Sequence, residues 1–346
     1  MLNPRYAFIS AYLKGQEAKT VTSYHITGMS RVSSVQEALA TIAGTNIGDY
    51  FQEVPVKNFD DLDEHLWKYF GEYIAHLEAF KFVPDEIIRV LRAYLAKYDV
   101  SNIKAAIQRA VTEGKATMIP LGTIHNHGLL AELSGAENIG DIRETLIKCE
   151  LSDYAFALKE VRTDDLAKSK LPAEAKLDEE YYQSLMNVTR KVKDGFILAK
   201  VFGIIIDLTN LQIASRAIVE GMGLEAAERL ISGGYMLTTD AVRELLPLKL
   251  TDMPGKLTNT PYHDVAEEIL GSYNKTQHIT SIDEVIDKHK FSLVKEILSP
   301  RVLSPLMIVW HLIVKELEIR NLRLVLKAMF DNILLEEIKP YLVVIS

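Results

Sequence analysis

The chain has little cysteine, little tryptophan and no excess of positive charge. Of its 346 residues only Cys149 is a cysteine, which excludes an internal disulfide and suits a reducing compartment. The formal net charge is −8, and no basic face is evident that would neutralise phosphates. These features argue against a secreted disulfide scaffold and against a nucleic-acid-binding protein.

Long hydrophobic runs are missing as well. The N-terminal residues 1–15 contain neither the apolar segment nor the small-residue cleavage site of a signal peptide. The most apolar stretch, 195–208, is interrupted by Lys200 and Asp207 and is too short to cross a bilayer. We therefore expect a soluble chain without direct membrane insertion, which could still sit on a membrane complex.

No set of alternating strands with regularly spaced turns is present. Segments rich in Leu, Ala, Glu and Lys, with apolar residues at i, i+3 and i+4, instead favour helices. The predicted helices are 7–22, 34–43, 60–79, 84–112, 142–160, 178–220, 224–231, 239–246, 262–270, 282–298 and 305–330. The predicted fold class is all-α, with 167–178 as a loop.

An acid followed three residues later by an asparagine recurs in the helices at 98–111, 206–219 and 317–330. The pairs are Asp99 and Asn102, Asp207 and Asn210, and Glu318 and Asn321. The asparagines are separated by 210 − 102 = 108 and 321 − 210 = 111 residues, and near-equal spacing predicts three copies of one unit. We place these helical repeats at 1–117, 118–230 and 231–346. Three such units could close into a ring or cup with pseudo-threefold symmetry.

The asparagines lie on apolar stripes, so they are either buried ties to a neighbouring loop or contacts to a partner's backbone. A buried amide without partners costs about 1–3 kcal/mol, which favours the tie. The acids either pair locally or handle protons. The expected local partners are basic residues about two turns later, namely Arg109, Arg216 and Lys327. We interpret all six residues as structural ties.

Signals for chemistry are weak. Residues 221–226 match G-x-G-x-x-A, but a dinucleotide fingerprint follows a strand, whereas this segment follows a predicted helix. His125 and His127 with Cys149 fit no familiar zinc spacing, and no G-x-S-x-G nucleophile elbow occurs. We expect no catalytic residues, no cofactor and no metal site.

Several of these segments resemble one family. Residues 315–328 read KELEIRNLRLVLKA, 92–107 read RAYLAKYDVSNIKAAI and 119–124 read IPLGTI. Together with GG at 233–234 and TPY at 260–262, they resemble the C subunit family of the V/A-type ATPases, whose eukaryotic equivalent is the d subunit of the V-ATPase. The opening departs from the family pattern, with Ser10 and Tyr12 where Asn and Arg are usual.

The resemblance implies a funnel of three helical bundles on the cytoplasmic face of the membrane. Such a subunit is a peripheral, non-catalytic part of the central stalk. It couples the axle subunits, of D and F type, to the membrane rotor ring during ATP-linked proton or sodium transport. The alternative is a helical-repeat scaffold that binds an unrelated protein partner.

Overall fold

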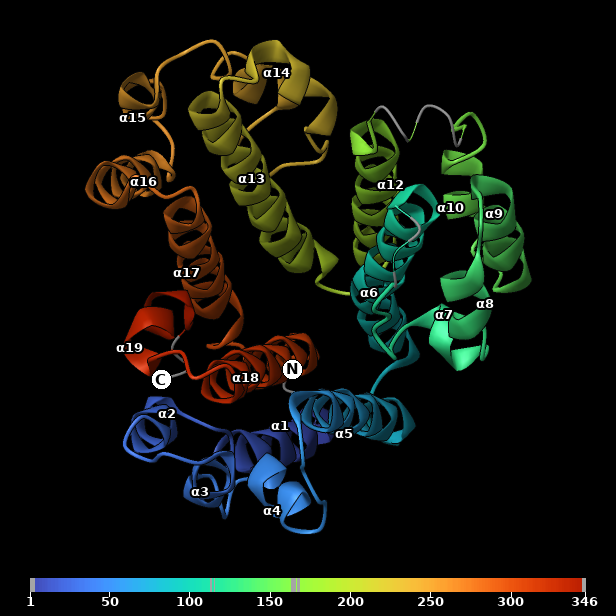
Figure 1. Ribbon diagram of the computed structural model, residues 1–346, viewed down its shortest axis with the longest axis vertical. Coiled ribbons are helices and arrows are strands. Elements are labelled where there is room, and N and C mark those ends of the chain that lie inside the picture. Colours follow the sequence, from blue (N-terminus) through green and yellow to red (C-terminus); the bar gives the residue numbers. More distant parts are fainter. Residues whose placement is uncertain (1–3, 113, 115, 163–165, 167–168, 344–346) are drawn as a thin grey trace. The chain divides into compact units, whose positions relative to one another are not determined.

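A computed structural model describes residues 4–112, 114, 116–162, 166 and 169–343 (Figure 1). The start of the first predicted repeat, the end of the third, and 167–168 of the predicted loop lie outside these ranges. Every regular element in the described ranges is a helix, and no strand occurs among them. The predicted all-α class is confirmed.

The chain divides into two compact units, and the first is discontinuous in sequence, containing 1–88 and 294–346. Its α-helices are α1 (Pro4–Glu17), α2 (Ser23–Met29), α3 (Val35–Thr41), α4 (Asn46–Gln52), α5 (Phe59–Ala79), α18 (Leu306–Phe330) and α19 (Leu335–Ile338). A short 3₁₀ turn, η3 (Lys339–Tyr341), follows α19. Both ends of the chain therefore contribute to one core.

Helix α18 is the centre of unit 1, with α1, α3 and α5 packed against it. Buried side chains, all apolar except His311, occupy its whole circumference from Leu306 to Leu312, so this part of α18 is a core helix. Helix α5 buries only one stripe, at Leu62, Leu66 and Phe70, spaced four residues apart. Its N-terminus is capped by Asn58, whose side chain accepts a hydrogen bond from the Asp61 amide at 2.8 Å.

The second unit contains residues 89–293. Its helices are α6 (Asp85–Thr112, from Arg89 on), α7 (Thr123–Asn126), α8 (Leu130–Gly135), α9 (Ile139–Lys148), α10 (Ser152–Ala157), α12 (Leu171–Arg190), α13 (Gly195–Glu220), α14 (Thr239–Arg243), α15 (Met253–Lys256), α16 (His263–Thr276) and α17 (Thr280–Leu298, up to Leu293). Two 3₁₀ turns, η1 (Gly223–Arg229) and η2 (Leu250–Asp252), follow α13 and precede α15. Within the unit α12 packs on α13, and α10 packs on α9 and α12.

Helix α13 is the only described helix that is long and apolar enough to cross a membrane by composition, with a mean hydropathy of 1.7 in its most apolar window. The same window is 61% buried inside the protein, and Asp207 and Asn210 lie within the helix fully buried and hydrogen-bonded. These features are typical of the core helix of a globular unit.

The helix boundaries differ from the prediction in several places. The predicted helix 7–22 ends at Glu17, and the predicted helix 142–160 is divided into α9 and α10. The predicted helix 178–220 is two helices, because α12 ends at Arg190 and Asp194 adopts the left-handed conformation with φ of 59°. The predicted loop 167–178 is wrong from Leu171 on, where α12 begins with a proline in its first turn. Alanine, glutamate and lysine in that segment have high helix propensity, which favours the helix over a loop.

Candidate functional site: three buried polar clamps

Each of the three asparagines holds the backbone of a residue beyond the end of its helix. In unit 2 the Nδ2 of Asn102 donates to the carbonyl of Ile119 at 2.9 Å, and its Oδ1 accepts from the Ile119 amide at 2.7 Å. Asn210 makes the same pair of bonds with Ile231, at 2.7 and 2.8 Å. The side-chain amides of Asn102 and Asn210 are both buried, so the two backbone bonds supply the partners that each amide needs inside the protein.

Asn321 forms the corresponding pair in unit 1. Its Nδ2 donates to the carbonyl of Val343 at 2.7 Å, and its Oδ1 accepts from the Val343 amide at 3.3 Å. By sequence, Ile338 lies at the position of Ile119, whereas the hydrogen bonds place the equivalent of Ile119 five residues later. The helical turns at α19 and η3 account for the added residues.

We call each acid–asparagine pair, together with the backbone that it holds, a clamp. In the first clamp, the acid accepts hydrogen bonds from backbone amides at the start of α7. Asp99 is fully buried and accepts from Thr123 and Ile124, both at 2.9 Å. Burial raises the pKa of Asp99, and the amide hydrogen bonds oppose the rise. Gly122 has φ of +94°, and a Cβ there would lie 2.5 Å from Oδ1 of Asp99. A glycine is therefore required for the loop to approach the carboxylate.

The acid of the second clamp has more donors. Asp207 is fully buried and accepts from three consecutive amides, those of Tyr235 at 3.1 Å, Met236 at 2.7 Å and Leu237 at 3.3 Å. The phenol of Tyr262 donates to the same carboxylate at 2.6 Å. Burial raises the pKa of Asp207 despite these bonds, and burial together with this hydrogen bond raises the pKa of Tyr262. A Cβ on Gly234 would collide with Oδ1 of Asp207.

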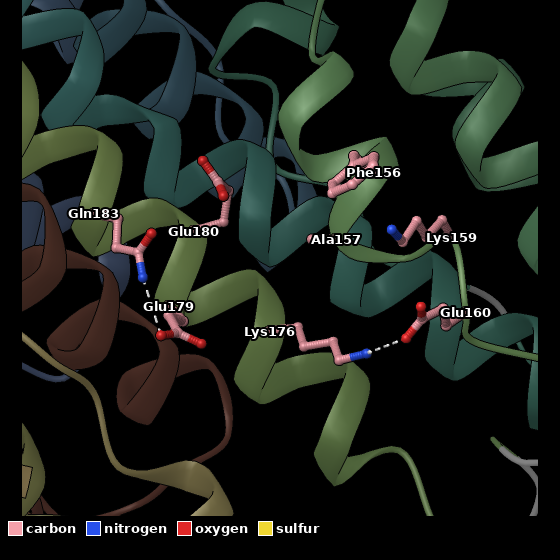
Figure 2. Close-up of a pocket in the computed structure, with 8 residues that line it drawn as sticks. All are labelled: Phe156, Ala157, Lys159, Glu160, Lys176, Glu179, Glu180 and Gln183. Atoms are coloured by element: carbon pink, nitrogen blue, oxygen red, sulfur yellow. Dashed lines mark hydrogen bonds and ion pairs between the residues drawn. The ribbon is translucent and has the colours of Figure 1, made fainter.

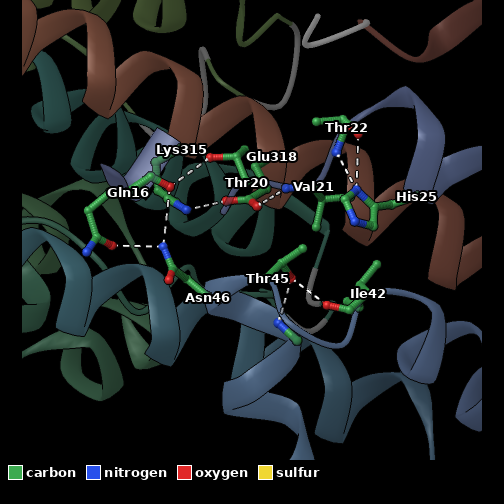
Figure 3. Close-up of polar contacts among 11 residues, drawn as sticks. Gln16, Thr20, Val21, Thr22, His25, Ile42, Thr45, Asn46, Lys315 and Glu318 are labelled. Carbon is green, nitrogen blue, oxygen red and sulfur yellow. Dashed lines mark hydrogen bonds and ion pairs between the residues drawn. The ribbon is translucent and has the colours of Figure 1, made fainter. Parts of the chain in front are cut away.

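The third clamp uses a cation. Glu318 accepts from the amide of Val21 at 2.6 Å, and its other oxygen pairs with the ammonium of Lys315 at 2.5 Å (Figure 3). Lys315 and Glu318 are 0% and 1% exposed. The ammonium also lies 5.8 and 5.4 Å from the ring centres of Tyr69 and Tyr73 on α5. The pair is thus a fully desolvated ion pair in the core of unit 1.

Beside this pair lies a neutral histidine. His311, one turn before Lys315 on α18, is fully buried, and its ring centre is 5.7 Å from that of Tyr73. Burial, followed by the charges of Lys315 and Lys14, lowers the pKa of His311 to about 3. The imidazole is therefore uncharged at neutral pH.

The basic residues expected to pair with the acids bind elsewhere. The acids are buried and accept the bonds given above, whereas the three basic residues are partly or fully exposed. Arg109 donates to the carbonyl of Ala136 at 2.6 Å, Arg216 pairs with Asp283 at 3.3 Å, and Lys327 pairs with Asp331 at 2.8 Å.

Sequence patterns did not identify Lys315 as a member of the third clamp, or Gly122, Gly234 and Tyr262 as residues around the acids. All four nevertheless lie inside the short motifs that resemble the family, because KELEI, IPLGTI, GG and TPY contain them. The motifs contain these residues, but the sequence does not show which acid each one meets, because Gly122, Gly234 and Tyr262 lie more than 20 residues from Asp99 or Asp207.

A shallow pocket of about 270 Å³ lies between α10 and α12 (Figure 2). Its charged side chains largely satisfy one another, since Lys176 lies 3.9 Å from Glu160 and Gln183 donates to Glu179 at 3.0 Å. Burial, with the nearby charges of Asp153 and Glu179, raises the pKa of Glu180 on the same wall. The lining residues are Phe156, Ala157, Lys159, Glu160, Lys176, Glu179, Glu180 and Gln183.

The weak chemical signals in the sequence find no chemical context in the structure. Gly221, with φ of +70°, ends α13, so 221–226 connects two helical segments rather than a strand and a helix. His125 and His127 are exposed whereas Cys149 is buried.

One group of possible metal ligands, His263, Asp264 and Glu267, has ligand atoms within 4.8 Å of one another. It begins α16, where the helix dipole stabilises carboxylates and disfavours a cation. The Nδ1 of His263 already bonds to the carbonyl of Pro254 at 2.9 Å. The group therefore carries no argument for a metal.

Long core helices fixed to loops by buried amides and carboxylates define an all-helical protein whose buried polar side chains hold its own backbone. Comparison with known proteins makes the class specific. Residues 9–341 match the model of the ATP synthase (C/AC39) subunit family, and the chain belongs to this family.

Archaeal relatives cover nearly the whole chain. It is 26% identical to the C subunit of the A-type ATP synthase of Methanocaldococcus jannaschii, across 98% of this chain and 86% of that protein. It is 22% identical to the C subunit of the A-type ATP synthase of Pyrococcus abyssi, across 96% of this chain and 89% of that protein. The predicted family is confirmed, and the alternative of an unrelated helical-repeat scaffold is not supported.

Proposed function

We propose that the chain is the non-catalytic central-stalk subunit of a rotary ATP synthase and acts as a socket between the axle and the membrane rotor ring. The observation that carries this proposal is the family match over residues 9–341, together with relatives named as the C subunit of A-type ATP synthases. A subunit that transmits torque needs stiff helices and no reactive centre. The buried clamps supply stiffness, since each fixes a loop to a long helix through hydrogen bonds inside the core.

The clamps also support the three-repeat organisation at 1–117, 118–230 and 231–346. Each of the three asparagines makes the same two-bond contact with one backbone residue, 17, 21 and 22 positions later. Shared geometry of this kind is expected of a triplicated unit. We propose Asp99, Asn102, Asp207, Asn210, Glu318 and Asn321 as the ties of these repeats, and a funnel or cup as their arrangement.

The partners follow from the proposed role. They are the axle subunits of D and F type and the membrane rotor ring, and the chain works as a peripheral subunit on the cytoplasmic face of the membrane. ATP turnover in the complete complex would drive, or be driven by, proton or sodium transport.

Affinity purification from cells that carry a tagged full-length chain tests this assignment. We expect both axle subunits and the ring subunit to co-purify in stoichiometric amounts. Recovery of other proteins without either axle or ring would refute the proposal.

A further inference from the structure

The turn between α12 and α13 concentrates positive charge around an exposed phenyl ring. Four cations are exposed here: Arg190 at the end of α12, Lys191 and Lys193 in the turn, and Lys200 in the second turn of α13. None of the four forms an ion pair with another described residue; Lys200 lies 5.1 Å from the ring centre of Tyr235. Phe196 stands among them with 74% of its surface exposed.

Two further exposed apolar residues lie on the same side of α13. The amide of Tyr235 donates to the carbonyl of Gly203 at 3.2 Å, which sets this loop on the helix two turns after Phe196. Tyr235 and Met236 are 45% and 49% exposed. The loop can approach because a Cβ on Gly203 would lie only 3.0 Å from Tyr235.

The local charge is opposite to that of the chain. Residues 190–200 contain four cations and one acid, the half-buried Asp194, on a chain with a net charge of −8. The N-terminus of the 26-residue helix α13 adds the positive end of its dipole at the same place. The cations are close together in the sequence, three of them within residues 190–193, and the residue 235 loop adds only Tyr235 and Met236 beside them. The expectation that the sequence shows no basic face is therefore wrong for this short segment.

We propose that this surface, made of Arg190, Lys191, Lys193, Phe196, Lys200 and Tyr235, binds the anionic headgroup layer of a phospholipid membrane. Unpaired lysines and arginines attract anionic lipid, each contributing about a fivefold gain in affinity near the surface. An exposed phenyl among them enters the boundary between headgroups and acyl chains. An acidic protein segment would account for the cations but leaves a phenyl exposed at the turn unexplained.

The contact is interfacial and does not require α13 to insert. Asp207 and Asn210 keep the middle of that helix inside unit 2 through buried hydrogen bonds. The inference goes beyond the proposed stalk function, because it assigns a lipid contact to the chain itself. The two fail separately, since vesicle binding is measured on the isolated chain with no other subunit.

The test is sedimentation of the purified full-length chain with vesicles of phosphatidylcholine alone or with about 30% phosphatidylglycerol, a composition chosen to give a negative surface potential. We expect binding to the anionic vesicles only, and its loss at high salt. The double variant Lys191→Gln/Lys193→Gln should bind about 25-fold more weakly, at about fivefold for each cation. Phe196→Ser should weaken binding about tenfold.

Matched controls come from exposed residues elsewhere in unit 2. Lys249→Gln/Lys256→Gln removes the same charge from an unrelated surface, and Phe156→Ser removes a similarly exposed phenyl. Both should bind as the unaltered chain does. The proposal is overturned by absence of vesicle binding, by equal binding to neutral vesicles, or by equal losses in the controls. Binding to an acidic subunit of the complex without vesicle binding would assign the surface to a protein partner instead.

Discussion

The clamps of unit 2 and the clamp of unit 1 each stabilise a buried carboxylate, but they do so with different hydrogen-bond donors. Asp99 and Asp207 are stabilised by hydrogen bonds from uncharged donors, two loop amides for Asp99 and three loop amides with a phenol for Asp207. Glu318 receives a single amide, from Val21, and a lysine on its own helix supplies the remaining compensation. A buried carboxylate is therefore stabilised either by several neutral donors or by one amide and a cation. In unit 1 the stabilisation depends on the single side chain of Lys315.

That dependence predicts the largest effect. Lys315→Met should lower the free energy of unfolding by about 3–5 kcal/mol, because Glu318 is left buried without its cation. Urea denaturation measures it. The double variant Lys315→Met/Glu318→Leu should recover most of the loss, since no charge then remains in the core. A single variant with an unchanged midpoint would show that Glu318 does not depend on Lys315.

Replacing the clamp asparagines by alanine should lower the free energy of unfolding by similar amounts in the two units. Asn210→Ala should cost about 2–3 kcal/mol and Asn321→Ala about 1–2 kcal/mol, because Asn210 is fully buried whereas Asn321 is 7% exposed and holds one bond at 3.3 Å. The exposed Asn274→Ala is the matched control and should change stability by less than about 0.5 kcal/mol. Variants at 210 and 321 that behave like the control would mean that neither amide is a tie.

The stability of unit 1 should also depend on pH through His311, the one histidine that is buried in the described part of the chain. Its folded pKa of about 3 lies below the unfolded value of about 6.5, so the unfolded chain binds the proton between these limits. The resulting stability is present above pH 6.5 and is lost as the pH falls toward 3.

Between about pH 7 and pH 5 this loss should be about 2 kcal/mol. Denaturation of His311→Leu and of the unaltered chain at both pH values isolates the contribution. A pH dependence that is identical in the two proteins would contradict the neutral, buried imidazole.

The smallest predicted effect concerns the loop at the first clamp. Gly122→Ala should cost about 1–2 kcal/mol, because the residue has φ of +94° and its new Cβ would press on Asp99. Gly135→Ala, where a Cβ meets nothing within 4 Å and φ is negative, is the control and should be neutral or slightly stabilising. Equal midpoints for the two alanine variants would remove the steric argument for glycine at the clamp.

Helix content, the family and the positions of the six polar residues were predictable from the sequence, because helical periodicity and short motifs are local. The partners of those residues were not. Arg109 and Arg216 lie on the same helices as the acids and looked like the natural choice, whereas the actual donors are amides 24 to 30 residues away. Those contacts depend on how the loops return to the helices, which no local pattern encodes.

The hydrogen bond from Val21 to Glu318 was even harder to predict from the sequence. It joins residues 297 positions apart and brings both ends of the chain into unit 1. The break between α12 and α13 was missed for a simpler reason. Asp194-Gly195 is a pair of residues typical of turns, but the apolar residues on both sides of it continue a helical pattern and masked the signal.

The most direct test of a mechanical, non-catalytic role compares ATP hydrolysis and ion transport in membranes from cells with and without this chain. A mechanical role predicts that hydrolysis by the catalytic head persists without the chain, whereas ATP-driven ion transport is lost and returns when the full-length chain is supplied. Transport that continues in its absence, or hydrolysis that disappears with it while the head remains assembled, would contradict that role.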